Sequence, residues 1–261
     1  MTETLIDTAH RAMEANPDDI QARMKYFERL ADSELFLLLT KEAEGETLSP
    51  ETFDISDGTF ILAFDTEDRL SAFVGKAAPY AALSGRVIAG MLQGQGIGIA
   101  LNPEVAPSSN IIDPQAVAWL AETVAVAPET TEARPESFLS PSVPAVLVAA
   151  LAEKLATAAG LAHSAYLVGV AYDSGAKGHL LGVIDAVAGS EGAIAKAVNE
   201  ALNFSGLEAA ALDVTFLSAQ DASAAALAKV GLRFDIPQPE PVEEYKPKAP
   251  GMDPDAPPIL R

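Results

Sequence analysis

The spacing of apolar and polar residues predicts two helices followed by buried strands at the start of the chain. Apolar positions recur at helical spacing over residues 4–15, and a second helix is expected over 18–32. Continuous apolar runs over 35–40 and 58–64 are typical of strands that are buried on both faces. The acidic segment between these runs, residues 41–57, is expected to be a mobile loop.

The pattern then alternates between helices and single strands. Asp65 and Thr66 precede a predicted helix over 67–75, and both side chains can accept hydrogen bonds from free N–H groups of its first turn. Further elements expected here are a strand over 79–83, a short helix over 84–92 and a helix that begins at 113–114. Because the strands lie too far apart to form hairpins, we expect a mixed α/β arrangement.

A glycine-rich stretch leads into a sharply bounded strand of this half. Glycines alternate at positions 94, 96 and 98, and an apolar strand over 97–101 ends at an Asn-Pro turn. Alternating glycines remove side chains from one face, so either a helix or a ligand must approach the backbone closely. The ligand alternative gives four candidate binding residues: Gly96, Gly98, Asn102 and Pro103. A dinucleotide loop would follow a strand and open a helix, so no nucleotide cofactor is expected.

The second half of the chain predicts a smaller α+β sandwich. Its expected elements are a helix over 140–159, hairpin strands over 164–172 and 178–186, a helix over 190–203, a strand over 212–217 and a helix over 221–231. From Pro237 onward there are 8 prolines in 25 residues, a composition that favours extended polyproline conformers over a packed core.

These patterns predict two domains. The expected division is a mixed-sheet α/β domain over 1–122, a weakly periodic linker over 123–139, a smaller α+β domain over 140–236 and a proline-rich tail over 237–261. Deleting that tail is expected to change thermal stability little, because proline-rich segments bury little apolar area.

Composition narrows the classes of partner. The chain has 261 residues, of which 37 are acidic and 17 basic, giving a formal net charge of −20. Such a surface repels nucleic-acid phosphates and anionic lipids, so neither nucleic acid nor membrane is an expected partner. No run approaches the ~20 apolar residues of a membrane span, and the amino-terminal residues lack the basic and apolar regions of a secretory signal. A cytoplasmic location is therefore expected.

The sequence lacks a recognisable catalytic or metal-binding pattern. Zero cysteines exclude disulfides, thiolate metal sites and cysteine nucleophiles. Ser190 misses the nucleophile-elbow spacing by one residue and is expected to cap a helix. His163 and His179 lie on the predicted hairpin with His179 opposite Ala171, too far apart to share a site. Neither a calcium loop nor a paired His-carboxylate spacing occurs, so no catalytic residue, metal or cofactor is expected.

A family resemblance becomes visible over residues 10–125. A strand ending in Phe64-Asp65-Thr66-Glu67, a helix, and the run from Gly96 to Asn102-Pro103 resemble the N-terminal domain of the SseB family, named for enhanced serine sensitivity. The second half has the element order of that family's C-terminal domain, although its closing Phe234-Asp235-Ile236-Pro237 departs from the Pro-Phe-Tyr-like ending of the family. The resemblance implies a two-domain cytoplasmic bacterial protein of undefined molecular role, and it supplies no catalytic residues.

Two functional hypotheses follow. The first is a non-enzymatic protein that binds a protein partner, a second copy of itself or a small ligand. The alternative is a carboxylate-based enzyme that acts on a small metabolite linked to amino-acid metabolism. A carboxylate cluster in a cleft near Asn102 would favour the enzyme, whereas an apolar patch would favour the binding protein.

Overall fold

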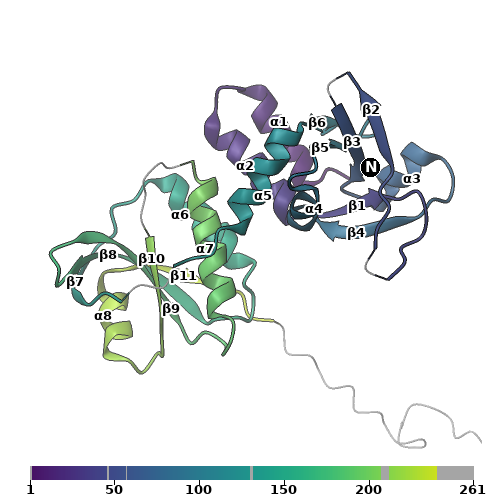
Figure 1. Ribbon diagram of the computed structural model, residues 1–261. Helices are drawn as coiled ribbons and strands as arrows, with labels where there is room; N and C mark the ends of the chain where they lie inside the picture. The colour runs from purple at the N-terminus through teal and green to yellow at the C-terminus, as the bar shows by residue number, and fades with distance from the viewer. Residues whose placement is uncertain (1, 46, 57, 130–131, 207–211, 240–261) are drawn as a thin grey trace, which may run out of the picture.

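The computed structural model of the chain describes residues 2–45, 47–56, 58–129, 132–206 and 212–239. These residues form two lobes, each built around its own β-sheet, with helices between them (Figure 1). We call residues 2–125 the first lobe and residues 135–239 the second lobe. Both sheets are mixed and both lobes contain helices, which confirms the predicted α/β and α+β fold class.

The first lobe is built around a mixed sheet with the strand order β4-β1-β3-β5-β6, and β2 pairs with β3. Only β3 and β5 pair in parallel among these strands. Its elements are α1 (Leu5–Ala15), α2 (Ile20–Asp32), β1 (Glu34–Leu38), β2 (Thr52–Ile55), β3 (Gly58–Phe64), α3 (Glu67–Val74), β4 (Tyr80–Ser84), α4 (Gly85–Leu92), β5 (Ile97–Leu101), β6 (Asn110–Ile112) and α5 (Pro114–Ala125).

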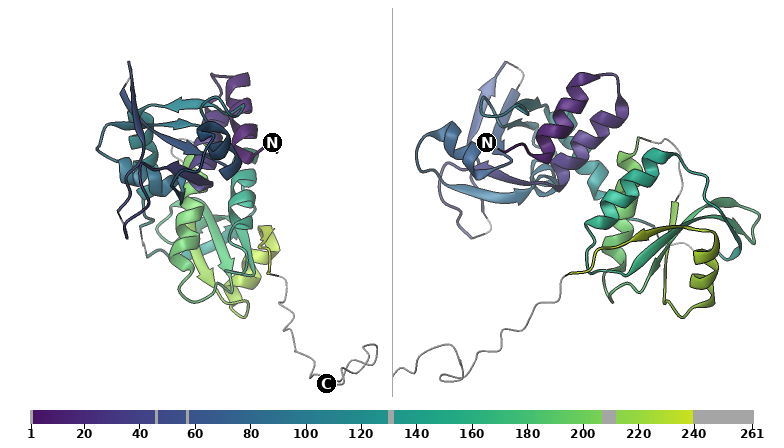
Figure 2. Two further views of the ribbon diagram at one scale, coloured as in Figure 1. Left: turned by 90° about the vertical axis from the view of Figure 1, so that its right-hand side faces the viewer. Right: turned by 180° about the vertical axis from the view of Figure 1, so that it is seen from behind.

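Side-chain alternation along the strands divides the first lobe into two unequal layers. Leu37 and Ile61 point to the face that is covered by α1, α2, α4 and α5. Phe60 and Phe64 point to the opposite face, where α3 supplies Leu70 to a smaller core. Figure 2 shows α1 and α2 (purple) as neighbouring helices on the helix-rich side. Burial of both faces explains why β1 and β3 are continuous apolar runs.

The second lobe repeats this plan at smaller size. Its sheet has the order β10-β9-β8-β11, with β7 also paired to β8 and with β10 parallel to β9. Helices α6 and α7 cover one face, and α8 covers the other with Leu227. Its elements are β7 (Pro135–Leu139), α6 (Ala145–Ala156), β8 (Ser164–Tyr172), β9 (Lys177–Ile184), α7 (Glu191–Phe204), β10 (Leu212–Leu217), α8 (Ala222–Val230) and β11 (Leu232–Asp235).

The lobes meet through α2, α5 and α7 (Figure 1). Phe204 at the end of α7 is buried in the main core of the first lobe, and its ring lies edge-on to Trp119 with 6.2 Å between centroids. A cluster of ion pairs between the lobes joins four helices. Its members are Lys25, Glu28, Arg29 and Asp32 on α2, Arg86 on α4, Glu153 and Lys154 on α6, and Glu200 on α7. We call these eight residues the junction network.

Several predicted elements agree with the structure. The strands over 58–64 and 97–101 have the predicted bounds, and the helices over 84–92 and from 114 are present as α4 and α5. The predicted strand over 212–217 is β10. The predictions succeed where a run of apolar residues is bounded by glycine, proline or a capping side chain.

Other predictions were wrong. Residues 41–57 were expected to form a loop, but β2 lies within them and forms a hairpin with β3, so the first lobe does contain a hairpin. The expected linker over 123–139 begins inside α5 and ends in β7, which pairs with β8. Both strands were missed because neither has an apolar run. Most side chains of β2 and β7 are exposed.

The hairpin of the second lobe has a different register from the predicted one. His179 pairs with Gly169 instead of Ala171, because the turn occupies Tyr172–Ala176. The chain after β11 stays packed on this lobe as far as Pro239. Gly160 donates its N–H to the Pro237 carbonyl at 2.9 Å, and the Gln238 side chain donates to Ala162. The rest of the predicted proline-rich tail, residues 240–261, lies outside the described residues.

Candidate functional site

The glycine predicted to lie under a helix, Gly98, instead makes room for a strand. A Cβ atom at Gly98 would lie 2.5 Å from the Ile112 carbonyl oxygen and 2.5 Å from two ring atoms of Phe60. Phe60 is the direct partner of Gly98 across the β3–β5 pair. The helix-packing prediction is therefore wrong, because the close neighbours of Gly98 are an aromatic ring of β3 and the backbone of β6.

Gly96 has a different role. It lies in the exposed turn before β5 with φ +68°, and nothing lies within 4 Å of the position its Cβ would occupy. A left-handed backbone favours glycine, so the turn geometry explains this residue. Ile99 and Leu101 of the same strand are buried on the opposite face, whereas Ile97 at its start is half-buried. Ligand binding at Gly96 stays a prediction.

Asn102 connects the end of β5 to the start of α3. It is fully buried with φ +49°, and its side-chain oxygen accepts a hydrogen bond from the Asp65 N–H at 3.1 Å. Its side-chain nitrogen donates to Ser108 at 3.0 Å. Pro103 is half-buried and continues the turn. Asn102 therefore fixes two loops to each other, and the Asn-Pro turn takes the chain out of the sheet as predicted.

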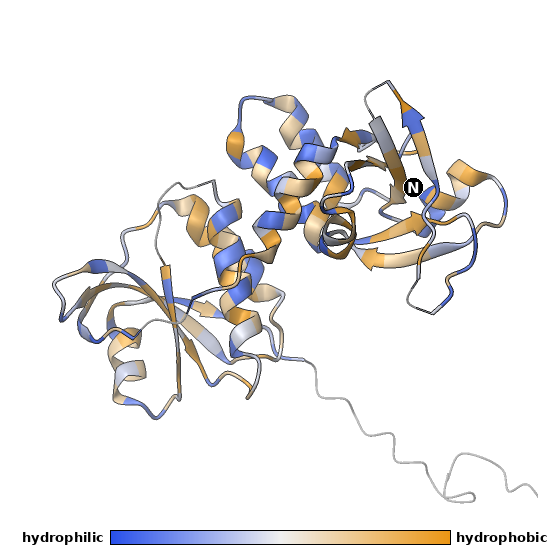
Figure 3. Cartoon of the chain, viewed as in Figure 1, coloured by the Kyte–Doolittle hydropathy of each residue, from blue (hydrophilic) through white to orange (hydrophobic). Residues whose placement is uncertain are grey.

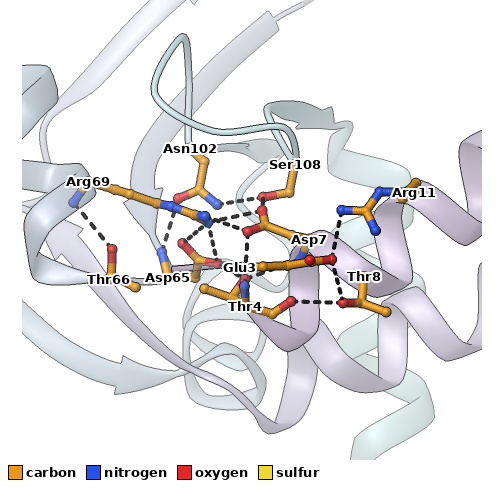
Figure 4. A network of polar contacts seen from close by, with 10 residues as sticks. All are labelled: Glu3, Thr4, Asp7, Thr8, Arg11, Asp65, Thr66, Arg69, Asn102 and Ser108. Atoms are coloured by element: carbon orange, nitrogen blue, oxygen red, sulfur yellow. Dashed lines mark hydrogen bonds and ion pairs between the residues drawn. The ribbon is translucent and has the colours of Figure 1, made fainter. Parts of the chain in front are cut away.

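A buried polar network lies beyond Asn102 (Figure 4). Arg69 of α3 donates to both carboxylate oxygens of Asp65, at 2.7 and 2.8 Å, and to Asp7 of α1 at 2.5 and 3.1 Å. Ser108 donates to Asp7 at 2.6 Å, and Thr4 donates to Asp65 at 2.6 Å. Thr4 and Asp7 also form the capping box of α1. We call Thr4, Asp7, Asp65, Arg69, Asn102 and Ser108 the Arg69 network.

The electrostatics of this network favour permanent charge. Burial alone raises the pKa of Asp7, but hydrogen bonds from Arg69 and Ser108 outweigh it and hold that pKa well below its usual range. The pKa of Arg69 is raised, because its hydrogen bonds to Asp7 and Asp65 outweigh the opposing effect of burial. Both terminal nitrogens of Arg69 donate to carboxylates, whereas its buried Nε has no hydrogen-bond partner among the described residues. Carboxylates that stay ionised and held by an arginine do not suit proton transfer, whereas they do suit fixing α1, α3 and the 102–108 loop in place.

The sheet face that carries Gly98 presents aromatic residues to solvent. Phe53 and Phe36 are half-buried on this face, and Phe73 of α3 is 37% exposed. Tyr80 of β4 is 38% exposed, and its ring lies edge-on to Phe36 with 5.5 Å between centroids. Figure 3 shows β1 and β4 as largely hydrophobic strands. We call Phe36, Phe53, Phe73 and Tyr80 the aromatic face.

A cavity of about 510 Å³ adjoins this face, and of the four rings that of Phe73 lines it. Its apolar walls come from the end of β1, the middle of β3 and the end of α3, through Leu38, Leu62 and Phe73. Thr40, Lys76 and Ala77 line its mouth and are exposed to solvent. This volume lies within the ~300–1,000 Å³ range of sites that accept small molecules or peptide side chains. We call it the aromatic groove.

One acidic and one basic residue line the aromatic groove, and two further carboxylates act on the hydroxyl of the neighbouring Tyr80. A hydrogen bond to Glu67 raises the pKa of the Tyr80 hydroxyl, so the neutral phenol donates to that carboxylate. The charge of Glu34 acts on the same hydroxyl, and Glu51 lines the cavity itself. Lys76 is the basic residue in the cavity lining. The lining is therefore mostly apolar, with one aromatic ring and one charged side chain of each sign.

The second lobe holds a smaller cavity of about 220 Å³ between β10, α8 and β7. Tyr172 and Asp213 line it, and the phenol donates to the carboxylate at 2.5 Å. Burial and this hydrogen bond together raise the pKa of Tyr172, so the phenol stays neutral. Within the described residues, no group of three or more histidine or acidic side chains is placed to hold a metal ion. No helix in the described part of the chain is long and apolar enough to cross a membrane.

Sequence reasoning missed both the Arg69 network and the aromatic groove. A signal for the network was present in Thr4-x-x-Asp7, a capping-box spacing, and in Asp65-x-x-x-Arg69, an ion-pair spacing on a helix. A weaker signal for the groove was the alternation of Phe60, Leu62 and Phe64 within an otherwise uniform apolar run. The chain separation of Asp7, Asp65 and Ser108 gave no direct sign that they meet.

The fold defines a two-lobed α/β protein with a partly exposed aromatic face on its first lobe. The family model described as SseB protein N-terminal domain matches residues 8–119, which include the aromatic face, the aromatic groove and most of the Arg69 network. Most of the first lobe is therefore similar to the N-terminal domain of SseB proteins. No curated protein and no solved structure matches it.

Proposed function

We propose that this chain is a non-enzymatic cytoplasmic member of the SseB family that binds a protein partner through the aromatic groove of its first lobe. The observation that carries the proposal is the exposure of Phe73 and Tyr80 beside an open, apolar-walled cavity. Exposed aromatic side chains are enriched at protein interfaces, where they bury large areas at a low cost in side-chain entropy.

The unequal covering of the sheet supports this role. Four helices cover one face of the first lobe, whereas α3, a helix of 8 residues, covers the other. The carboxylates near Asn102 support binding over catalysis, since Asp7 and Asp65 are buried side chains held by Arg69. An acid–base role would instead need a carboxylate that can reach a substrate.

The test compares a blocked groove with a matched control. Ala77→Arg places a long charged side chain at the mouth of the groove, and Ala152→Arg makes the same change at an exposed position of α6 in the second lobe. Tagged versions of the full chain are purified from cells of its source organism, and the bound proteins and metabolites are identified by mass spectrometry. We expect a protein that the wild type and Ala152→Arg retain and Ala77→Arg loses.

Three results would contradict the proposal. If every retained protein binds Ala77→Arg as well as it binds the control, the groove is not the binding site. If the retained species that depends on the groove is a metabolite, the protein binds a small ligand instead. If that metabolite is also turned over, the enzyme alternative is correct.

A further inference from the structure

The cavity of the second lobe contains a carboxylate without a positively charged partner. Asp213 lies on β10, the edge strand of the sheet, and forms no ion pair among the described residues. Its Oδ2 accepts a hydrogen bond from the Tyr172 hydroxyl at 2.5 Å. Because the pKa of Tyr172 is raised, this phenol stays neutral and the carboxylate is the charged member of the pair. The cavity therefore holds one negative charge with no counter-charge.

The remaining walls of this cavity are mostly apolar and include two aromatic side chains. Phe138 of β7 and Tyr172 of β8 supply the rings, and Leu180 and Leu227 add aliphatic surface. Within the described part of the chain, no lysine, arginine or histidine lines the cavity. The face of an aromatic ring carries partial negative charge and attracts organic cations, whose alkyl groups also fit apolar walls. A carboxylate beside aromatic rings is thus suited to a cation that carries alkyl groups.

We propose that the cavity binds a small organic ammonium ion, with its charge beside Asp213 and its alkyl groups against Phe138 and Tyr172. The volume of about 220 Å³ limits the size of the ligand. It lies below the ~300–1,000 Å³ of sites for drug-sized molecules, so it suits an ion as small as a trimethylammonium compound. The site belongs to the second lobe and does not depend on the aromatic groove of the first.

Access and charge both favour such an ion. Asp213 and Ser223 are exposed, so the cavity opens to solvent at this edge of the sheet. The net charge of −20 raises the concentration of every cation near the protein surface. The walls then select among these cations, because a small inorganic ion would lose its water shell against apolar groups that cannot replace it. An alkylammonium ion loses less, since its alkyl groups make the contacts.

Titration of the ¹⁵N-labelled full chain, followed by nuclear magnetic resonance, tests the proposal. The probe is choline, and its neutral isostere 3,3-dimethyl-1-butanol has a carbon atom in place of the charged nitrogen. We expect choline to bind about tenfold more tightly than the isostere, with the shift changes centred on residues that line the cavity. Sodium chloride at equal concentration measures the general attraction of an acidic surface and should leave these signals unchanged.

Three variants locate the charge and the rings. Asp213→Asn keeps the shape of the side chain and should weaken choline binding about tenfold. Asp235→Asn is the matched control, because it removes an exposed carboxylate from β11 at the opposite edge of the sheet and should change nothing. Phe138→Leu keeps an apolar wall without the ring and should also weaken binding, so it tests the site independently of any effect of Asp213→Asn on folding.

Four outcomes overturn the proposal. Equal affinities for choline and its isostere would show that the cavity does not recognise charge. Equal shift changes with sodium chloride would reduce the effect to general attraction, and unchanged binding in Asp213→Asn would place the ion elsewhere. Binding of N-acetyl-lysine methylamide more tightly than choline would identify the cation as a protein side chain. None of these results bears on the Ala77→Arg capture experiment, which tests the first lobe.

Discussion

Removal of one ammonium group from the junction network should weaken the whole fold. The Lys154 side chain is 6% exposed, and its Nζ lies 2.6 Å from Asp32, 3.3 Å from Glu200 and 3.5 Å from Glu28. The side chains of Glu28 and Glu200 are 3% and 2% exposed. Lys154→Met keeps much of the apolar stem but leaves three carboxylates around an apolar group.

The cost can be worked out from the partners that remain. Breaking a buried ion pair by removing one member costs about 3–5 kcal/mol, because the other charge stays buried. Glu200 keeps two hydrogen bonds from Arg86, at 2.8 and 3.1 Å, and Glu28 keeps Lys25 at 2.8 Å. These contacts place the expected loss at the lower end, about 3 kcal/mol. For a chain of this size that loss lowers the melting temperature by roughly 6–12 °C.

Urea denaturation followed by far-ultraviolet circular dichroism measures this loss. A cavity of about 380 Å³ at the junction is lined by Lys154 of α6 and by Lys196 of α7. Lys196→Met is the matched control, because Lys196 forms no ion pair among the described residues. That control should change the free energy of unfolding by less than about 0.5 kcal/mol. If Lys154→Met changes stability no more than Lys196→Met does, the junction network does not stabilise the protein and the reasoning is refuted.

Three further predictions follow from the first lobe and from the segment between the lobes. Gly98→Ala should destabilise the protein by about 2–4 kcal/mol, because its Cβ would overlap the Ile112 backbone. Gly96→Ala should cost only about 1 kcal/mol, as backbone strain. Equal chemical-denaturation midpoints for the two variants would contradict the packing account. Because the pKa of Asp7 is depressed in the folded state, its stabilisation is present above the unfolded pKa of about 4 and is lost as the pH falls below it. When the pH is lowered from 5 to 3, Asp7→Asn should therefore lose less thermal stability than the wild type. Thermal unfolding at each pH measures this loss, and equal losses in the two proteins would contradict the prediction. We propose that the lobes are separate domains. Limited proteolysis should then cut first within residues 126–134, between α5 and β7. First cuts inside either lobe would contradict this division into domains.

The elements that sequence reasoning predicted share a local cause. Residues 58–64 and 97–101 are apolar runs with clear ends, and the Asp113-Pro114 pair marks the start of α5. Periodicity and capping depend on neighbours in the chain, so the sequence contains what is needed. Strands β2 and β7 lie at exposed positions and form because a partner strand supplies their hydrogen bonds. Tertiary context decides such strands, and single-sequence patterns do not contain it.

The candidate site was harder to predict for the same reason. Asn102 was recognised as unusual, but its partners Asp65 and Ser108 lie in two other segments. Gly98 was recognised as a point of close approach, but the approaching group is its cross-strand neighbour Phe60, and the strand register decides that pairing. The aromatic face arises from four separate elements. Only the folded sheet shows that these rings gather on its thinly covered side.

The position of Trp119 gives the protein an internal optical reporter. It is the only tryptophan of the chain, and its ring lies against Phe27 of α2 and Phe204 of α7, at 5.2 and 6.2 Å between centroids. One of these rings belongs to each lobe, so separation of the lobes would expose one side of the indole to water while the first lobe stays folded. Water around an indole shifts its fluorescence to longer wavelength. Emission from this single residue can therefore follow the opening of the junction separately from unfolding, in the unlabelled protein and in real time.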